Sequence, residues 1–198
     1  MNKIDLNKQQ KRKNLLDAAF RFFTSKGIHD TSISDIVRDA GVAKGTFYLY
    51  FKDKYDIRNK LIAYKSSEMF READVKLKQA EITDPVEKVI FLADHVINQF
   101  VTDRMLLKFI SKKLSWGVFK NVFIEGGGSD DGDFYDIYHA VFEDDSKYEN
   151  TEIMTFMIVE LVSSTCYSSI LYGEPVEIDI LKPYIFRAIR QIMATHER

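Results

Sequence analysis

Between Thr31 and Lys54 the sequence gathers small hydroxyl, glycine, tyrosine and lysine residues. Such residues bind the phosphates of nucleic acids through side chains and backbone N–H groups, and a few of them reach base edges. Lys44, Gly45 and Thr46 stand together and supply a cation, a point of close backbone approach and a small hydroxyl. The candidate DNA contacts in this stretch are Thr31, Ser32, Lys44, Gly45, Thr46, Tyr48, Tyr50 and Lys54.

Two short helical patterns joined at a glycine would position these residues. Ser32 can cap the first helix, and Asp35 three residues later can return the bond. Apolar residues then recur at helical spacing on one face, at Ile33, Ile36, Val37 and Ala40. Gly41 ends this helix, because glycine readily takes the left-handed conformation of a sharp turn. A second helix, Lys44 to Phe51, must begin within about three residues, which predicts a DNA-binding helix-turn-helix.

The second helix divides between packing and contact. Phe47 and Phe51 are expected to hold it to the rest of a small domain, which leaves Tyr48 to reach a phosphate through its hydroxyl. Tyr50 is compatible with either role. The residues that lead the helix, Lys44 to Thr46, are expected to face bases, since the start of the second helix reaches base edges in this motif.

Lys54 stands at an electrostatically unfavourable position. Asp53 is a good cap for the next helix and Asp56 follows three residues later, so Lys54 falls at the first helical position. A cation there opposes the helix dipole. A phosphate lying beside it would reverse the sign of the effect, so Lys54 is predicted to contact a phosphate.

The pattern T-x-x-x-I-x-x-x-A-G-V-x-x-G-x-x-Y-x-Y-F-x-x-K resembles the N-terminal signature of TetR-type transcriptional regulators, with Ile36 one place later than the simplest spacing. The resemblance implies an all-α fold: a three-helix helix-turn-helix DNA-binding domain (1–55) joined by a long helix to a helical effector-binding and dimerisation domain (56–198). Ala43 departs from the family, which commonly has a capping serine there, and loss of such a cap costs about 0.5–2 kcal/mol.

Charge is divided unevenly along the chain. Residues 1–60 hold 13 Lys and Arg against 7 Asp and Glu, whereas residues 61–198 hold 15 against 23. The basic part coincides with the predicted DNA-binding part, so a net charge of −2 does not argue against nucleic-acid binding. Upstream, Lys8, Lys11, Arg12 and Lys13 either follow the DNA backbone or form only a solvated helix start.

Helical periodicity continues through most of the chain. We expect helices over Gln9 to Lys26, Asp56 to Ala80, Pro85 to Val101, Glu149 to Tyr172 and Val176 to Thr195. The helix over Asp56 to Ala80 would link the DNA-binding part to the core without a flexible hinge. A tilt of this helix would then move the second helix of the helix-turn-helix, which is the recognition helix. The helix over Glu149 to Tyr172 is apolar nearly all round and therefore needs packing partners on two sides.

The resemblance implies that the last two helices pair with their copies as a four-helix bundle in a homodimer, although they could instead complete a monomer core. The predicted dimer interface is Phe156, Glu160, Ser164, Tyr167, Ile170, Leu181, Tyr184, Ile185, Ala188 and Ile192. The resemblance also implies a pocket for a small apolar effector among the aromatic residues of the middle. For any single one of these residues, ordinary core packing is the favoured alternative. The candidate pocket residues are Phe109, Trp116, Tyr138, Phe142 and Met157.

Other classes of protein find little support. The four histidines stand singly, and no Ser/His/Asp set or nucleotide fingerprint is visible, so we expect no enzyme, cofactor or metal site. Cys166 is interpreted as a small buried hydrophobe. No signal peptide or apolar run of membrane-spanning length is apparent, which predicts a cytoplasmic protein without membrane contact.

The expected function is that of a ligand-responsive repressor, bound as a homodimer to a palindromic double-stranded DNA operator. The alternatives are a transcriptional activator with the same helix-turn-helix, or a helical adaptor whose basic part contacts protein or anionic lipid.

Overall fold

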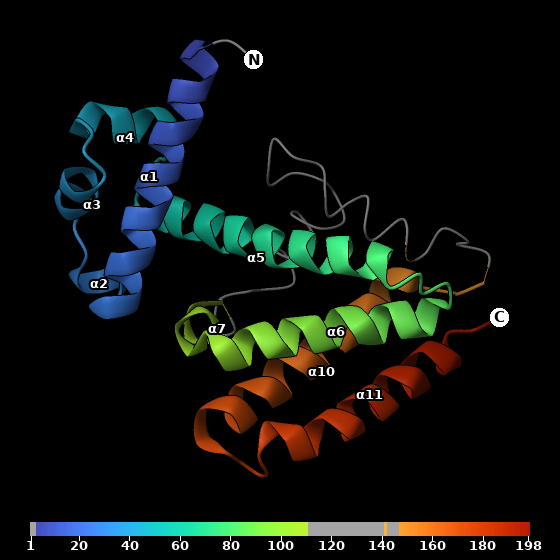
Figure 1. Cartoon of the computed structure of the whole chain (residues 1–198). Coiled ribbons are helices and arrows are strands. Elements are labelled where there is room, and N and C mark those ends of the chain that lie inside the picture. The colour runs from blue at the N-terminus through green and yellow to red at the C-terminus, as the bar shows by residue number, and fades with distance from the viewer. Residues whose placement is uncertain (1–2, 111–140, 142–146) are drawn as a thin grey trace. The chain divides into compact units, whose positions relative to one another are not determined.

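The computed structural model describes residues 3–110, 141 and 147–198, and every regular element in these ranges is an α-helix (Figure 1). The chain forms two compact units, Met1–Tyr64 (unit 1) and Lys65–Arg198 (unit 2). The all-helical fold predicted from the sequence is confirmed.

Unit 1 contains α1 (Lys3–Ser25), α2 (Gly27–Asp30), α3 (Ile33–Asp39), α4 (Lys44–Tyr50) and the start of α5 (Lys54–Gln79). Figure 1 shows α2, α3 and α4 following one another beside α1, which packs against α2 and α3. Apolar side chains from all the longer helices are buried: Leu15, Leu16, Ala18, Ala19, Phe23, Ile36, Val37, Ala40, Phe47, Phe51, Ile57, Leu61 and Ile62. Unit 1 includes α5 as far as Tyr64, and Ile57 and Leu61 of this helix are fully buried. The domain boundary after Tyr55 stays a prediction.

Unit 2 contains the rest of α5 together with α6 (Pro85–Thr102), α7 (Arg104–Ile110), α10 (Thr151–Tyr172) and α11 (Ile178–Thr195). In Figure 1, α6, α10 and α11 lie side by side, and each of the three packs against the other two. Asp84 caps α6 by accepting the N–H of Glu87 at 2.9 Å, and Pro85 occupies the first helical turn. Gly173 ends α10 in the left-handed conformation, with φ +68°.

α10 requires one correction to the sequence interpretation. Its 22 residues are long and apolar enough to cross a membrane by length and composition, so such a run is present after all. A helix that packs in a helical core meets the same criterion, and α10 packs against α6, α7 and α11. Its buried side holds Met154, Ile158, Val162 and Ile170, and also Cys166, whose thiol pKa burial raises to about 12.

Candidate nucleic-acid interface

The start of α3 is fixed by the capping box that the sequence predicts. The Ser32 hydroxyl accepts the N–H of Asp35 at 3.1 Å, and the Asp35 carboxylate accepts the N–H of Ser32 at 3.2 Å. The same carboxylate lies 2.9 Å from Lys26 Nζ and 3.0 Å from an Arg38 nitrogen. The hydrogen bond from Lys26, followed by those from Ser32, holds the pKa of Asp35 well below its usual range.

The turn between α3 and α4 begins at Gly41, which has φ +67°, the left-handed conformation expected of it. The N–H of Val42 donates to the Val37 carbonyl at 3.0 Å and closes the end of α3. Ala43 then precedes α4 in an extended conformation, with no side-chain hydrogen bond to cap the helix. The recognition helix therefore begins without the side-chain cap whose absence the sequence indicates.

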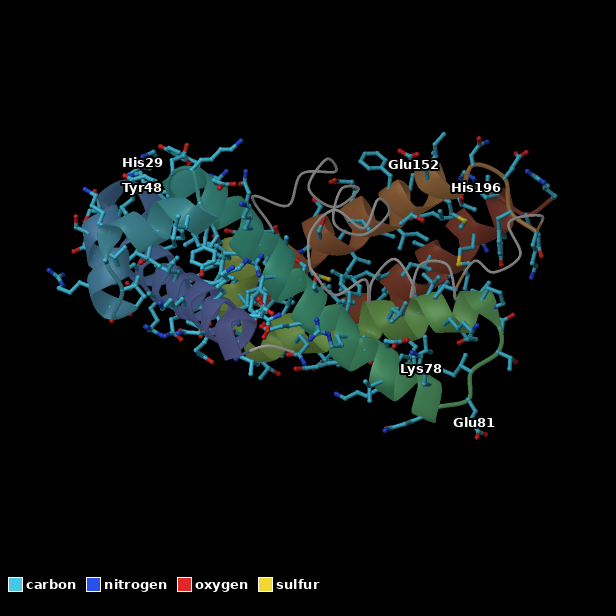
Figure 2. The ribbon with its side chains drawn as sticks, turned by 90° about the horizontal axis from the view of Figure 1, so that it is seen from above. His29, Tyr48, Lys78, Glu81, Glu152 and His196 are labelled. Atoms are coloured by element: carbon cyan, nitrogen blue, oxygen red, sulfur yellow. The ribbon has the colours of Figure 1, made fainter. Side chains whose placement is uncertain are left out.

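α4 has a buried side and an open side. Phe47 and Phe51 are 0% and 1% exposed, and their ring centroids are 5.5 Å apart, as expected for residues that hold the helix in place. On the other side Tyr48 is 54% exposed and Leu49 is 80% exposed. Figure 2 shows Tyr48 and His29 at the outside of the ribbon of unit 1.

The start of α4 is open to a partner. Lys44 and Gly45 are exposed, and Thr46 is half-buried. A Cβ built on Gly45 meets no atom within 4 Å, and its φ is not in the left-handed region. Glycine inside a helix costs about 0.5–1 kcal/mol relative to alanine. Nothing within the described residues calls for that cost, so Gly45 fits a position that another molecule approaches closely.

Four predicted contacts are engaged within the chain, and the first is Ser32, whose hydroxyl takes part in the capping box described above. Thr31 is 2% exposed, and its hydroxyl donates to the Gly27 carbonyl at 2.7 Å. The Tyr50 hydroxyl donates to the Lys8 carbonyl at 3.2 Å. Lys54 Nζ donates to the His29 carbonyl at 3.0 Å and lies 3.5 Å from the Thr31 carbonyl. A cation at the first position of α5 therefore has carbonyl partners at the C-terminal end of α2, which offset its unfavourable place on its own helix dipole.

Leu49 is a candidate contact that the sequence interpretation missed. It follows Tyr48 on the side of α4 opposite Phe47 and Phe51, and an exposed leucine there suits apolar contact with a thymine methyl group. Helical periodicity carried the signal, because the two phenylalanines at i and i+4 define the buried side and leave positions 48 and 49 outside.

Sequence comparison agrees with this geometry. A family model described as bacterial regulatory proteins, tetR family, matches residues 15–61, from the first buried leucine of α1 into α5. The HTH-type transcriptional regulator AcrR of Shigella flexneri is 31% identical over 108 residues, which are 53% of this chain and 50% of that protein. The N-terminal part of the chain is therefore similar to TetR-family regulators.

Two further proteins similar to this chain have names or titles that concern fatty acids or a fatty acyl-CoA. The fatty acid metabolism regulator protein of Bacillus subtilis is 36% identical over 72 residues, which are 36% of this chain and 37% of that protein. The chain thus spans about half, or less, of the length of these curated relatives. The crystal structure of the regulator FadR from Bacillus subtilis in complex with stearoyl-CoA shares the fold, with TM-score 0.57 and 19% identity over 89% of this chain and 96% of that one.

The predicted effector pocket lies only partly within the described residues. Trp116, Tyr138 and Phe142 lie outside the described residues. Phe109 is half-buried on α7, whereas Met157 is 43% exposed on α10. The pocket therefore stays a prediction.

The predicted dimer residues fall into three groups. Phe156, Glu160, Ser164 and Tyr184 are exposed. Four others are half-buried, namely Tyr167, Leu181, Ala188 and Ile192. Ile170 and Ile185 are 5% and 2% exposed, so their side chains already pack within the single chain. The dimer interface therefore stays a prediction.

Proposed function

We propose that this chain is a ligand-responsive transcriptional repressor that binds a palindromic DNA operator as a homodimer in the cytoplasm. The observation that carries the proposal is the two-sided character of α4. Its phenylalanines are fully buried, while Lys44, Gly45, Tyr48 and Leu49 face solvent on a helix that a left-handed glycine sets off from α3. That is the arrangement by which a helix-turn-helix presents its second helix to the major groove.

Residues of different chemistry would contact different groups of the DNA. Lys44 and Thr46, at the start of α4, would reach base edges or phosphates, and Gly45 would let the backbone come close. Tyr48 would donate to a phosphate and Leu49 would meet a thymine methyl. The excess of Lys and Arg in residues 1–60 supplies an attractive field for the DNA backbone.

The exterior of the last two helices supports the proposal of a homodimer. Ile153, Phe156 and Met157 are exposed at helical spacing on α10, and Ile180 and Tyr184 are exposed on α11. Exposed apolar groups gathered on adjacent helices are typical of an interaction surface. Two copies related by a two-fold axis would present two recognition helices to half-sites about 34–36 Å apart, or a multiple of that distance.

The inferred effector is small and apolar, with long-chain acyl-CoA as the first probe. Support comes from the names of two relatives, a regulator of fatty acid metabolism and a FadR protein crystallised with stearoyl-CoA. α5 runs from Lys54 in unit 1 to Gln79 in unit 2. An effector that tilts this helix would change the spacing of the paired α4 helices and release the operator.

The proposal can be tested by fluorescence anisotropy with DNA taken from the region upstream of the gene that encodes this chain. We expect the palindromic fragment to bind at least 10³-fold more tightly than random DNA at moderate salt, within the usual range of about 10³–10⁷ for specific binding. Stearoyl-CoA should weaken the specific complex. Equal affinity for both DNAs would reject operator recognition, and tight binding to anionic vesicles instead would favour the adaptor. In vitro transcription then distinguishes repression from activation.

A further inference from the structure

Tyr50, the last residue of α4, is held at both ends by other helices. Its carbonyl accepts a hydrogen bond from Lys60 Nζ at 3.0 Å, on α5. Its hydroxyl donates to the carbonyl of Lys8 at 3.2 Å, on α1. Figure 1 shows α4 beside the N-terminal half of α1, where this second bond lies. Tyr50 therefore connects three helices of unit 1.

The α5 end of this connection is firmly fixed. Lys60 Nζ also lies 3.3 Å from the Asp56 carboxylate and 5.4 Å from the centre of the Phe51 ring. The same Asp56 oxygen accepts the N–H of Lys52 at 2.8 Å. Lys60 and Asp56, one turn apart on α5, thus hydrogen-bond to the backbone on both sides of Phe51. These bonds hold the backbone of Tyr50 in place.

The α1 end is different, because the first turns of α1 are barely packed. Residues 5–11 are all exposed, and Leu15 is the first fully buried side chain. Lys8, Lys11 and Arg12 stand at i, i+3 and i+4, so they share one face of the helix. With so few packing contacts, the bond to Lys8 is a large part of what can fix the direction of this basic face.

We propose that Tyr50 is a positioning residue, which orients the basic face of Lys8, Lys11 and Arg12 along the backbone of DNA bound by α4. This rests on the proposed function. A phenol has one proton to donate, and both the Lys8 carbonyl and a phosphate are acceptors. The hydroxyl cannot donate to both, so Tyr50 acts through α1, whereas the exposed Tyr48 keeps its hydroxyl for DNA.

A double-mutant cycle tests whether Tyr50 acts on DNA binding through the basic face of α1. Tyr50→Phe should weaken operator binding about two- to tenfold, the range that one hydrogen bond supports. In a Lys8→Gln, Lys11→Gln, Arg12→Gln background the same change should have no effect, because the oriented charges are gone. Tyr48→Phe is the matched control, and it should cost the same factor in both backgrounds. A Tyr50→Phe effect that is equal in both backgrounds, or absent from the wild-type chain, overturns the proposal, as does wild-type affinity in the triple variant.

Amide hydrogen exchange in DNA-free protein gives a second readout. Tyr50→Phe should speed exchange of the amides of residues 7–13 while leaving residues 36–40 in α3 unchanged, and unchanged exchange in residues 7–13 overturns the proposal. The exchange result does not depend on DNA. Wild-type protein that fails to prefer its operator would therefore reject the proposed function, whereas normal operator preference with an additive cycle rejects only the role of Tyr50.

Discussion

α4 and α10 each have a buried side and an exposed side, but their exposed sides differ in chemistry. α4 buries two phenylalanines and exposes a lysine, a glycine and a tyrosine around one leucine. α10 buries an apolar side and exposes another, with Ile153 at 54%, Phe156 at 39% and Met157 at 43%. The first surface suits an anionic ligand and the second an apolar one. The difference is consistent with the proposal that DNA and a second copy bind at chemically distinct helices.

The strongest way to break this comparison is to place a charge on the exposed face of α10. Phe156→Glu would bury an unpaired carboxylate in a dimer, so we expect the dimer dissociation constant to rise by on the order of 100-fold or more. Operator binding should fall with it. Sedimentation velocity over a range of concentrations measures the change. Gln79→Glu, an exposed site on α5, is the control, and a variant as dimeric as this control would rule out the α10 face.

On α4, Gly45→Ala should separate stability from binding. Alanine at this open position should stabilise the chain by about 0.5–1 kcal/mol, because glycine loses more conformational freedom in a helix. The added methyl group should nevertheless weaken operator binding about tenfold if DNA approaches the backbone closely, since specific contacts carry about 1–3 kcal/mol each. Urea unfolding and anisotropy measure the two effects. Tighter or unchanged DNA binding would mean that this part of α4 does not approach DNA.

Two lysines of unit 1 allow a finer comparison. Lys44 is exposed at the start of α4, so Lys44→Met should lower the salt dependence of DNA binding by about one unit if it neutralises one phosphate. Lys54 donates to the His29 and Thr31 carbonyls, so Lys54→Met should mainly cost stability, about 1 kcal/mol for the lost hydrogen bonds. DNA-binding titrations of both variants at several salt concentrations distinguish the two roles. If the slope of log K against log salt also fell by about one unit in the Lys54 variant, Lys54 would be a phosphate contact.

The sequence predicts local features of unit 1 well, because their causes lie within a few residues. The Ser32 and Asp35 capping box, the left-handed Gly41 and the buried Phe47 and Phe51 are all found as expected. What it misses depends on partners far away in the chain. The Tyr50 hydroxyl meets a carbonyl 42 positions away, and Lys54 meets one 25 positions away.

In unit 2 the same reasoning predicts helices but not surfaces. α6 begins at Pro85, as its cap and proline indicate. The predicted dimer interface includes Ile170 and Ile185, yet both are buried within the chain. Periodicity identifies that a helix such as α10 has apolar faces, but it cannot tell which of them meets its own neighbours.

Acid should distinguish the two helices by the way each begins. α3, which positions α4, depends on ionised Asp35, whereas α10 begins at Asn150 without a side-chain cap hydrogen bond. Because folding lowers the pKa of Asp35, its ionised carboxylate stabilises the folded state at pH values above its unfolded pKa of about 3.9. This stabilisation is lost progressively as the pH falls below about 3.9. Urea unfolding of wild type and Asp35→Asn between pH 3 and pH 7 should give curves that differ most near neutrality and converge in acid. Parallel curves would show that Asp35 contributes nothing that depends on its charge.

Amide exchange, corrected for its intrinsic pH dependence, should show α3 losing protection in acid before α10 does.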